Sequence, residues 1–373
     1  MIRILITGDF CPQLRVEELL LSGHHELIFN DLLQELKGND LNIANLECPL
    51  VKEMNPSAKT GPNLASLAEA AGALKFAGIN ILTLSNNHIM DQGADGLIST
   101  LDICRKNNIE CTGAGRDIRE ASEVLIKEIK GRRIAILNFS ENEFSTAEAG
   151  SPGANPLNPV QNYYSIKSAR EKADHVIVIV HGGHEGYSLP SPRMVETYRY
   201  FIDVGADIVV GHHAHCYSGY ESYGDGCIFY GLGNFIFDWD GMRDADWNFG
   251  YAVRLNLEGK RISFDIIPYS QCNDRPGVFL LNAEETEKFN DRLVSLNRIL
   301  SDGELIRQEW VKFVRERKKY YLMHFEFFSG RLYQLLRSRN LLPGSISRRK
   351  KLSILNLVRC EAHRDIIIDS LKS

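Results

Sequence analysis

Hydrophobic residues in this chain fall into short β-branched runs, separated by stretches in which they recur every three or four positions. The first pattern is typical of buried strands and the second of amphipathic helices. Up to about residue 215 the two alternate, with strands expected over 2–7, 41–44, 79–84, 176–180 and 208–210, and helices over 25–36, 64–77, 94–106, 118–130 and 192–204. This alternation predicts an α/β protein with a largely parallel central sheet.

The pattern changes after residue 215. Runs at 227–230, 251–257 and 261–267 follow one another as strands, which predicts a mixed sheet or a second, antiparallel one. The stretch 150–162 is rich in Pro, Asn and Gly and predicts a long loop. From residue 284 onward the pattern is helical, over 289–300, 305–336 and 346–371. We therefore expect a main domain over residues 1–280 and a helical C-terminal extension over 281–373.

Each of the five strands before residue 215 runs directly into a short polar motif. The motifs are Gly8-Asp9, Asn45-Leu46-Glu47, Ser85-Asn86-Asn87-His88, His181 to Glu185, and Gly211 to His215. Buried strands need no carboxylates or imidazoles at their ends for stability, whereas open α/β sheets build their sites at the carboxyl ends of strands. The pattern predicts one site assembled from five segments.

Taken singly, each motif also has an ordinary structural explanation. Gly8-Asp9 could be a turn or a helix cap, and Ser85 to His88 an Asx-turn with a hydrogen-bonded histidine. Histidines gathered at three strand ends argue against that explanation for the whole set. Alternate residues of an extended segment point the same way, so His213 and His215 can address one site. Imidazoles beside carboxylate and amide oxygens suit Zn, Mn, Fe or Ni.

Composition narrows the class of protein. The chain is 44% hydrophobic and 24% charged, which is ordinary for a soluble globular protein. No apolar run approaches the ~18–20 residues of a membrane helix, and Met1 leads at once into a strand, so we expect a cytoplasmic protein. The eight cysteines form no CxxC pair, which predicts neither a zinc ribbon nor a disulfide framework. Cys11, two residues after Asp9, is the one expected near chemistry.

The net charge of −5 hides an asymmetry, because residues 307–364 hold 15 Lys and Arg against 4 Asp and Glu. Such a basic region could contact anionic lipid at a membrane surface, a polyanionic polymer or nucleic acid. The alternative, which we favour, is a solvated helical face whose apolar stripe packs on the main domain or on a second subunit.

The strand-end motifs, together with Thr112 to Arg116 and Gly231 to Asp238, resemble the signature of the CapA family. These are poly-γ-glutamate capsule biosynthesis proteins within the metallophosphoesterase superfamily, and the resemblance spans about residues 2–270. It implies an αββα sandwich of two mixed sheets, with two divalent metal ions (Mn, Zn or Fe) between the strand ends.

The resemblance also implies residue roles. Asp9 and His215 would hold one metal, Asn87, His181 and His213 the other, and Glu47 would bridge both. His88 would act as general acid, oriented by Asp91. The residues expected to support the ligands or contact the substrate are Asn86, His184, Glu185, His212, Asn234 and Cys11.

The implied function is that of a metal-dependent hydrolase in capsule or exopolymer biosynthesis, attacking a phosphoester or amide. An anionic polymer or phosphoester would be the substrate, and capsule-synthesis proteins would be partners. Two departures matter: the superfamily's Asp-x-His is here Asp9-Phe10-Cys11, and Glu47 stands where many relatives have Asp. The missing histidine favours the alternative of a non-catalytic scaffold or polymer-binding component of a capsule synthesis complex.

Overall fold

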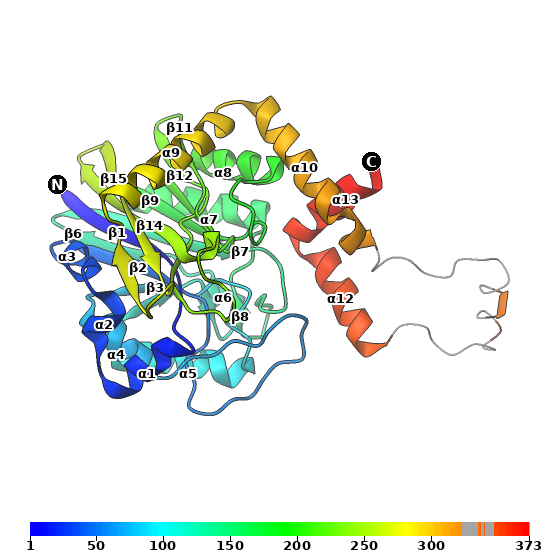
Figure 1. Cartoon of the computed structure of the whole chain (residues 1–373), viewed down its shortest axis with the longest axis horizontal. Helices are drawn as coiled ribbons and strands as arrows, with labels where there is room; N and C mark the ends of the chain where they lie inside the picture. Colours follow the sequence, from blue (N-terminus) through cyan, green and yellow to red (C-terminus); the bar gives the residue numbers. More distant parts are fainter. Residues whose placement is uncertain (323–334, 337–338, 340–346, 373) are drawn as a thin grey trace.

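Two β-sheets packed face to face form the body of the protein, and helices cover their outer sides (Figure 1). The structure is a computed structural model that describes residues 1–322, 335–336, 339 and 347–372. The predicted αββα architecture is confirmed.

Sheet 1 is mixed and has the strand order β16-β15-β14-β1-β2-β3-β4, with β13 also paired to β1. Its first four strands in the chain run parallel, whereas β14, β15 and β16 are antiparallel to their neighbours. The strands are β1 (Ile2–Cys11), β2 (Leu41–Leu46), β3 (Ile81–Thr83), β4 (Glu110–Thr112), β13 (Asn234–Phe237), β14 (Phe249–Glu258), β15 (Arg261–Gln271) and β16 (Val278–Leu280).

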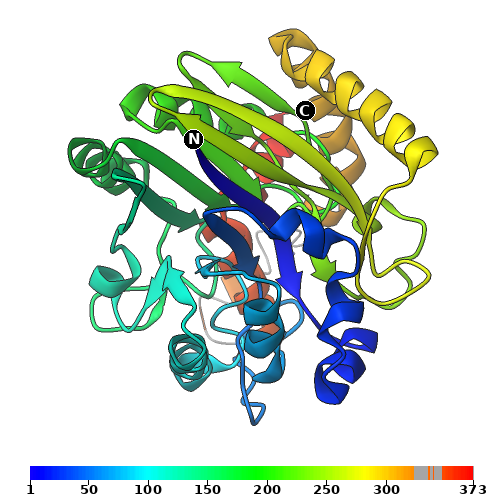
Figure 2. The same ribbon diagram turned by 90° about the vertical axis from the view of Figure 1, so that its left-hand side faces the viewer.

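Strand β1 runs through the middle of sheet 1 (Figure 2). Ile4 and Ile6 belong to the core shared with sheet 2, whereas Leu5 belongs to the core beneath the helices on the other face. The strand also changes partner along its length: residues 2–6 pair with β14, and residues 9–11 pair with β13. In the ladder with β2 the register shifts between Ile6 and Asp9. This irregularity includes Gly8, the first residue of the first polar motif.

Sheet 2 has the order β11-β12-β10-β9-β7-β6, and its four central strands are parallel. The strands are β6 (Leu125–Ile129), β7 (Arg132–Ser140), β9 (His175–His181), β10 (Ile208–His212), β11 (Tyr220–Tyr223) and β12 (Gly226–Phe229). A two-stranded ladder of β5 (Ala114–Gly115) and β8 (Gly153–Ala154) stands apart.

The helices divide between the two sheets. Residues of α1 (Arg15–Ser22), α2 (His25–Phe29), α3 (Leu32–Leu36), α4 (Glu69–Phe76) and α5 (Gly93–Lys106) bury their apolar faces on sheet 1. Residues of α7 (Pro159–Lys172), α8 (Pro192–Val204) and α9 (Ala283–Leu300) join the core of sheet 2.

The helix expected over residues 118–130 is wrong. The segment forms a short helix, α6 (Ile118–Ala121), and then strand β6. Lys130 and Gly131 both have positive φ, 51° and 73°, and they join β6 to β7 as a two-residue hairpin turn. A turn with both central residues in the left-handed region matches the twist of antiparallel strands. Pairing with β7 therefore outweighs the local helical spacing.

Other boundaries also differ from expectation. The helix expected over 25–36 is divided into α2 and α3 at Asn30, whose φ is 45°. The helix expected over 64–77 begins only at Glu69. Helix α7 begins at Pro159, inside the stretch expected to be a loop, because Asn158 caps it by accepting hydrogen bonds from the backbone N–H groups of residues 160 and 161.

The C-terminal region is helical as predicted: α9 is followed by α10 (Gly303–Leu322), α12 (Arg348–Arg359) and α13 (Glu361–Lys372). The predicted helix over 305–336 lies partly outside the described residues, and the one over 346–371 is broken at Cys360. Phe289 and Leu293 of α9 pack into the core of sheet 2, and a boundary at residue 280 stays a prediction. Among the described helices, none is both long and apolar enough to cross a membrane.

Candidate metal centre

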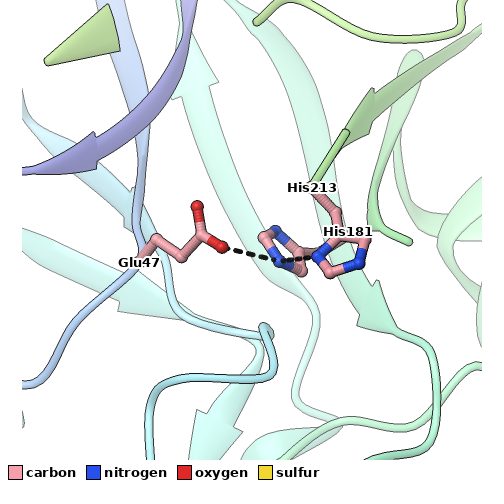
Figure 3. Close-up of side chains that lie close together, drawn as sticks. All are labelled: Glu47, His181 and His213. Atoms are coloured by element: carbon pink, nitrogen blue, oxygen red, sulfur yellow. Dashed lines mark hydrogen bonds and ion pairs between the residues drawn. The ribbon is translucent and has the colours of Figure 1, made fainter. Parts of the chain in front are cut away.

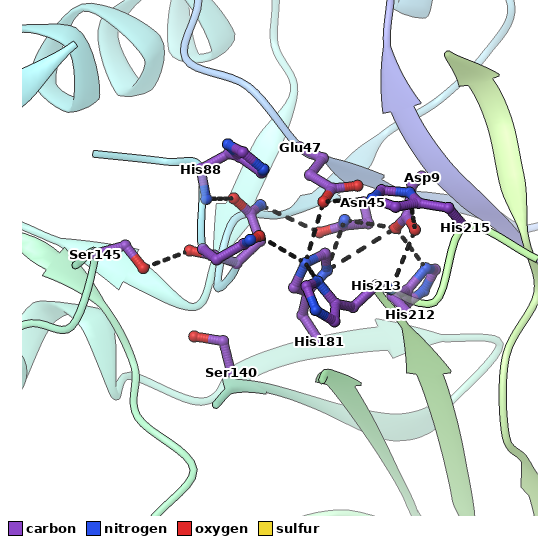
Figure 4. A network of polar contacts seen from close by, with 12 residues as sticks. Asp9, Asn45, Glu47, His88, Ser140, Ser145, His181, His212, His213 and His215 are labelled. Atoms are coloured by element: carbon purple, nitrogen blue, oxygen red, sulfur yellow. Dashed lines mark hydrogen bonds and ion pairs between the residues drawn. The ribbon is translucent and has the colours of Figure 1, made fainter. Parts of the chain in front are cut away.

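The five polar motifs lie together at the carboxyl ends of β1, β2, β3, β9 and β10, between the two sheets (Figure 4). Their side chains form one buried network of hydrogen bonds and ion pairs. Its members from these motifs are Asp9, Asn45, Glu47, Asn86, Asn87, His88, His181, His212, His213 and His215.

Glu47 lies at the centre of two possible ligand groups. It shares one group with His181 and His213 (Figure 3) and the other with Asp9 and His215, and within each group the ligand atoms lie within 4.8 Å of one another. Its Oε1 is 3.3 Å from His181 Nε2 and 3.7 Å from His215 Nε2.

Among the residues that the structure describes, the Glu47 carboxylate has no hydrogen-bond partner, although both of its oxygens are buried. Burial and the neighbouring Asp9 raise the pKa of Glu47 well above its ordinary value. A buried carboxylate without hydrogen bonds is costly unless a cation or a proton compensates it. Carboxylate and imidazole donors in this number suit a divalent transition-metal ion, so the residues fit the metals that the sequence suggests.

Asp9 is held in place from three sides. Its Oδ1 accepts a hydrogen bond from Asn45 Nδ2 (2.7 Å) and lies 3.0 Å from His212 Nδ1, and its Oδ2 accepts one from the His213 backbone N–H (3.1 Å). Burial opposes ionisation, but the imidazoles of His212, His181 and His215 outweigh it and hold the pKa of Asp9 below its ordinary value. Asp9 is therefore an ionised carboxylate facing the cluster.

His213 and His215 adopt unusual backbone conformations, with φ of 92° and 55°. Residues other than glycine rarely adopt positive φ, and where they do the strain is commonly tied to function. The His215 Nδ1 lies 2.9 Å from Asn234 Oδ1, which leaves Nε2 as the ring nitrogen near Glu47. Such contacts to the far nitrogen orient metal-binding imidazoles.

His181 joins the second group through its Nε2. That atom lies 3.0 Å from Asn87 Oδ1 and 3.1 Å from His213 Nδ1. Burial and the neighbouring His213 lower the pKa of His181 well below its ordinary value. The ring is therefore neutral, which is the form that binds metals.

His88 and Asp91 lie beside the cluster and contact each other. The His88 Nδ1 is 2.6 Å from Asp91 Oδ2, which also accepts a hydrogen bond from the Leu64 backbone N–H. Lys59 forms an ion pair with Asp91, and its Nζ lies 3.3 Å from His88 Nδ1. Burial and the Lys59 ammonium lower the pKa of His88.

The remaining predicted residues have different surroundings. Asn86 shapes the turn after β3, since its Oδ1 accepts from the His88 backbone N–H (3.1 Å) and its Nδ2 donates to the Leu46 carbonyl (2.8 Å). The His184 Nε2 lies 2.9 Å from the carbonyl of Ala362 in α13. Cys11 is buried in the core beneath sheet 1, and burial with the neighbouring Cys48 raises the pKa of its thiol. Among the described residues it belongs to neither ligand group.

Several residues of the network escaped the sequence prediction. Asn45 touches both Asp9 and His181, and Glu141 lies next to the cluster at the end of β7. Strand β7 runs from an apolar segment into Ser140-Glu141-Asn142, the same pattern that marks the other motifs, so this signal was present in the sequence. Lys59 comes from a segment without regular secondary structure and carries no such signal.

A cavity of about 490 Å³ opens over the cluster. Asn87, His88, His213 and His215 line one side of it, with Glu185 at its edge. Two predicted ligands of the second group, Asn87 and His213, thus face the same space as His215 of the first group and the predicted general acid.

Fold and site together define an α/β protein of two packed sheets, with carboxylates and imidazoles gathered at the strand ends. The chain belongs to the family of bacterial capsule synthesis proteins, because the family described as "Bacterial capsule synthesis protein PGA_cap" matches residues 3–239. The predicted family resemblance is thereby confirmed.

Two relatives show how far the similarity reaches. The capsule biosynthesis protein CapA of Bacillus anthracis is 32% identical, over 65% of this chain and 61% of its own length. The PGA biosynthesis protein CapA of Bacillus subtilis (strain 168) is 32% identical, over 70% of this chain and 69% of its own length. The similarity thus spans about three fifths of the first relative.

Proposed function

We propose that this chain is a metal-dependent hydrolase of capsule biosynthesis that cleaves a phosphoester or amide bond in an anionic substrate. The observation that carries the proposal is Glu47, which belongs to both ligand groups and whose two buried oxygens lack hydrogen bonds within the described part of the chain. Asp9, His215 and Glu47 would hold one divalent ion, and Glu47, His181, His213 and Asn87 the other. The names of the relatives support the assignment to capsule or poly-γ-glutamate metabolism.

Two divalent ions, when bound, supply Lewis-acid activation of water and of the scissile group. The chain's own residues would then manage position and protons. Asp91 fixes the His88 ring through Nδ1, which leaves Nε2 as the nitrogen free to exchange a proton within the cavity that His88 lines. His88 would protonate the leaving group there, as a general acid positioned by a buried carboxylate. Asn234 and His212 would keep His215 and Asp9 in their orientations.

The test measures metal content and turnover on the same preparations. The purified chain is titrated with Mn²⁺ or Zn²⁺ and assayed on a generic phosphodiester and on a γ-glutamyl amide. We expect His88→Ala to lower kcat by about 10²–10⁴-fold without changing the metal content, because proton transfer contributes that much. Glu47→Ala should lose both bound metal and activity.

His24→Ala is the matched control, because His24 is exposed on the surface and far from the cavity lining. A phosphodiesterase or amidase activity that His88→Ala leaves intact would refute the assigned role. Turnover that does not depend on added metal would refute the hydrolase itself.

A second candidate function is a polymer-binding component without turnover. The observation that favours it is Cys11, which stands where the superfamily has a histidine and which packs into the core. Stoichiometric metal with binding of an anionic polymer but no turnover on either bond type would support this function over the hydrolase.

A further inference from the structure

The cavity over the metal centre has a second wall, and this wall comes from the C-terminal helices. Phe313, Arg317 and Tyr321 of α10, Asn356 of α12 and His363 of α13 line it opposite the strand ends. We call α10, α12 and α13 together the C-terminal cap; Figure 1 shows it beside the sandwich. The family match ends at residue 239, so the cap lies outside the matched segment.

Directional polar contacts fix the cap at the site. The Ala362 backbone N–H donates to Glu141 Oε2 (3.2 Å), and Asn142 donates to the Glu361 carboxylate from its backbone N–H (2.9 Å) and its side chain (2.8 Å). Arg193 Nε donates to Asp365 Oδ2 (2.8 Å). Since residues 141 and 142 follow β7 directly, the cap is anchored to the same sheet edge that carries the cluster.

An aromatic contact reinforces the attachment. The rings of Trp310 and Phe313 in α10 pack against His184, with centroids 4.9 and 5.6 Å apart, and Phe313 stacks on Tyr187 at 4.2 Å. His184 also meets the carbonyl of Ala362. The segment after β9 is therefore held between the metal centre and the cap, so the position of the cap is linked to the geometry of the cavity.

Arg317 is the cap residue best suited to bind a substrate. It lines the cavity, and its guanidinium lies over the Phe313 ring at 5.3 Å from the centroid. Lys59, the other long basic side chain of the lining, is neutralised by Asp91. Arg317, by contrast, has no carboxylate partner among the residues that the structure describes. A guanidinium in this position matches a carboxylate or phosphate oxyanion.

We propose that the C-terminal cap is the specificity wall of the active site and that Arg317 binds a non-reacting oxyanion of the substrate. The role as an active-site wall rests on the proposed hydrolase function, whereas oxyanion binding by Arg317 does not require turnover. The cap would select substrates with a negative charge beyond the scissile bond, and the strand ends would act on that bond. One residue of the basic C-terminal region, Arg317, would thus take part in substrate binding.

Isothermal titration calorimetry of the metal-free full-length chain tests oxyanion binding without relying on turnover. The two probes are a short γ-glutamyl oligomer and inorganic phosphate, which separate carboxylate from phosphoryl recognition. We expect Arg317→Ala to weaken binding of the preferred probe about tenfold, since a charge-assisted hydrogen bond is removed. Arg317→Lys should recover part of the affinity.

Arg315→Ala is the matched control, because Arg315 and Arg317 are both exposed arginines of α10 and only Arg317 belongs to the cavity lining. Unchanged affinity in Arg317→Ala overturns the proposal, as does an equal loss in Arg315→Ala or a lack of binding of both probes to the unmodified chain. If the hydrolase test fails while Arg317→Ala still loses affinity, the binding role stands without the catalytic one.

Discussion

The stability of the protein should depend on pH through the protonation of Glu143. It lines the cavity between the sheet edge and α12, and burial raises its pKa to about 7. Glu185 and Glu141 act in the same direction, whereas Lys59 and a hydrogen bond with Asn356 oppose the shift. Burial and the charge of Glu143 raise the pKa of the Cys360 thiol, which lies between α12 and α13.

The sign of the effect follows from the raised pKa. The folded chain holds the Glu143 proton more tightly than the unfolded chain, whose carboxyl has the ordinary value of 4.5, so stability falls as the pH rises from about 4.5 through 7. Between pH 5 and 8, the free energy of unfolding should fall by on the order of 2 kcal/mol less in Glu143→Gln than in the parent. Thermal unfolding of the variant and the parent at both pH values measures the difference.

Glu53→Gln provides the comparison for Glu143, because Glu53 is exposed and does not line the cavity. Asp365, whose pKa burial raises to about 6, titrates in the same range in both proteins and cancels in the difference. Parallel pH profiles of parent and Glu143→Gln would contradict the assignment.

At the scale of elements, the bulge in β1 places Asp9. Gly8 lies within it, and the Asp9 backbone N–H donates to the Gly233 carbonyl (3.2 Å). A Cβ built on Gly8 would lie 1.9 Å from the Gly233 carbonyl oxygen, so only glycine allows this close approach. The close approach of β1 to the segment before β13 therefore fixes the position of Asp9 relative to the other residues of the cluster.

Gly8→Ala should lower the free energy of unfolding by about 3 kcal/mol, at the upper end of the cost of overpacking. Gly72→Ala is the opposite case, because Gly72 lies in α4 and its added Cβ would meet only the His25 ring, at 3.8 Å. That change should be neutral or stabilise by up to about 1 kcal/mol, as alanine is the better helix former. Chemical denaturation measures the free energy of unfolding of both variants. If the two are equally stable, the close approach of Gly8 to Gly233 is ruled out.

Much of the fold could be predicted from local pattern, and the misses have two causes. The five strand ends could be read because each joins a continuous apolar run to polar residues, and side chains from all five meet in the cluster. Strand β6 and the hairpin turn at Lys130 depend on pairing with β7, which local spacing does not encode. Helix α7 carried a capping signal in Asn158-Pro159 that the Pro- and Asn-rich composition obscured.

For the same reason, the sequence predicts which strand-end residues lie together in the candidate site. It does not predict which residues complete the wall of the cavity. Asp9 and His181 lie at the carboxyl ends of β1 and β9. Glu47 follows β2, and His213 and His215 follow β10, so the topology brings all five together. Arg317, Glu143 and Lys59 reach the cavity through the docking of distant helices and an irregular segment. Charge counting along residues 307–364 shows a basic region, but it does not distinguish an exposed arginine outside the cavity lining from one that belongs to it.

For the whole molecule, metal removal should be visible as a loss of stability. A ligand that binds the folded chain alone stabilises it by about 2.7 kcal/mol at a free concentration of 100 Kd. We expect chelation to lower Tm by several degrees and added Mn²⁺ or Zn²⁺ to restore it. The buried carboxylate of Glu47, which has no hydrogen bond to the described residues, supplies the physical reason, since the apo chain keeps that group buried.

Glu47→Gln separates this effect from nonspecific action of the chelator. The variant should lose the metal-dependent part of Tm while its apo form stays at least as stable as that of the parent, because a neutral amide replaces the buried carboxyl. A metal-dependent rise in Tm that survives in Glu47→Gln would count against the assignment of the centre.

The partners of β1 have a consequence for synthesis on the ribosome. Strand β1 pairs with β14 and β13, which lie more than 220 residues later in the chain. Contacts of such long sequence separation slow folding, because their loop entropy is lost before they can stabilise anything. The edge of β1 that pairs with β14 therefore stays unpaired until residue 257 has been synthesised.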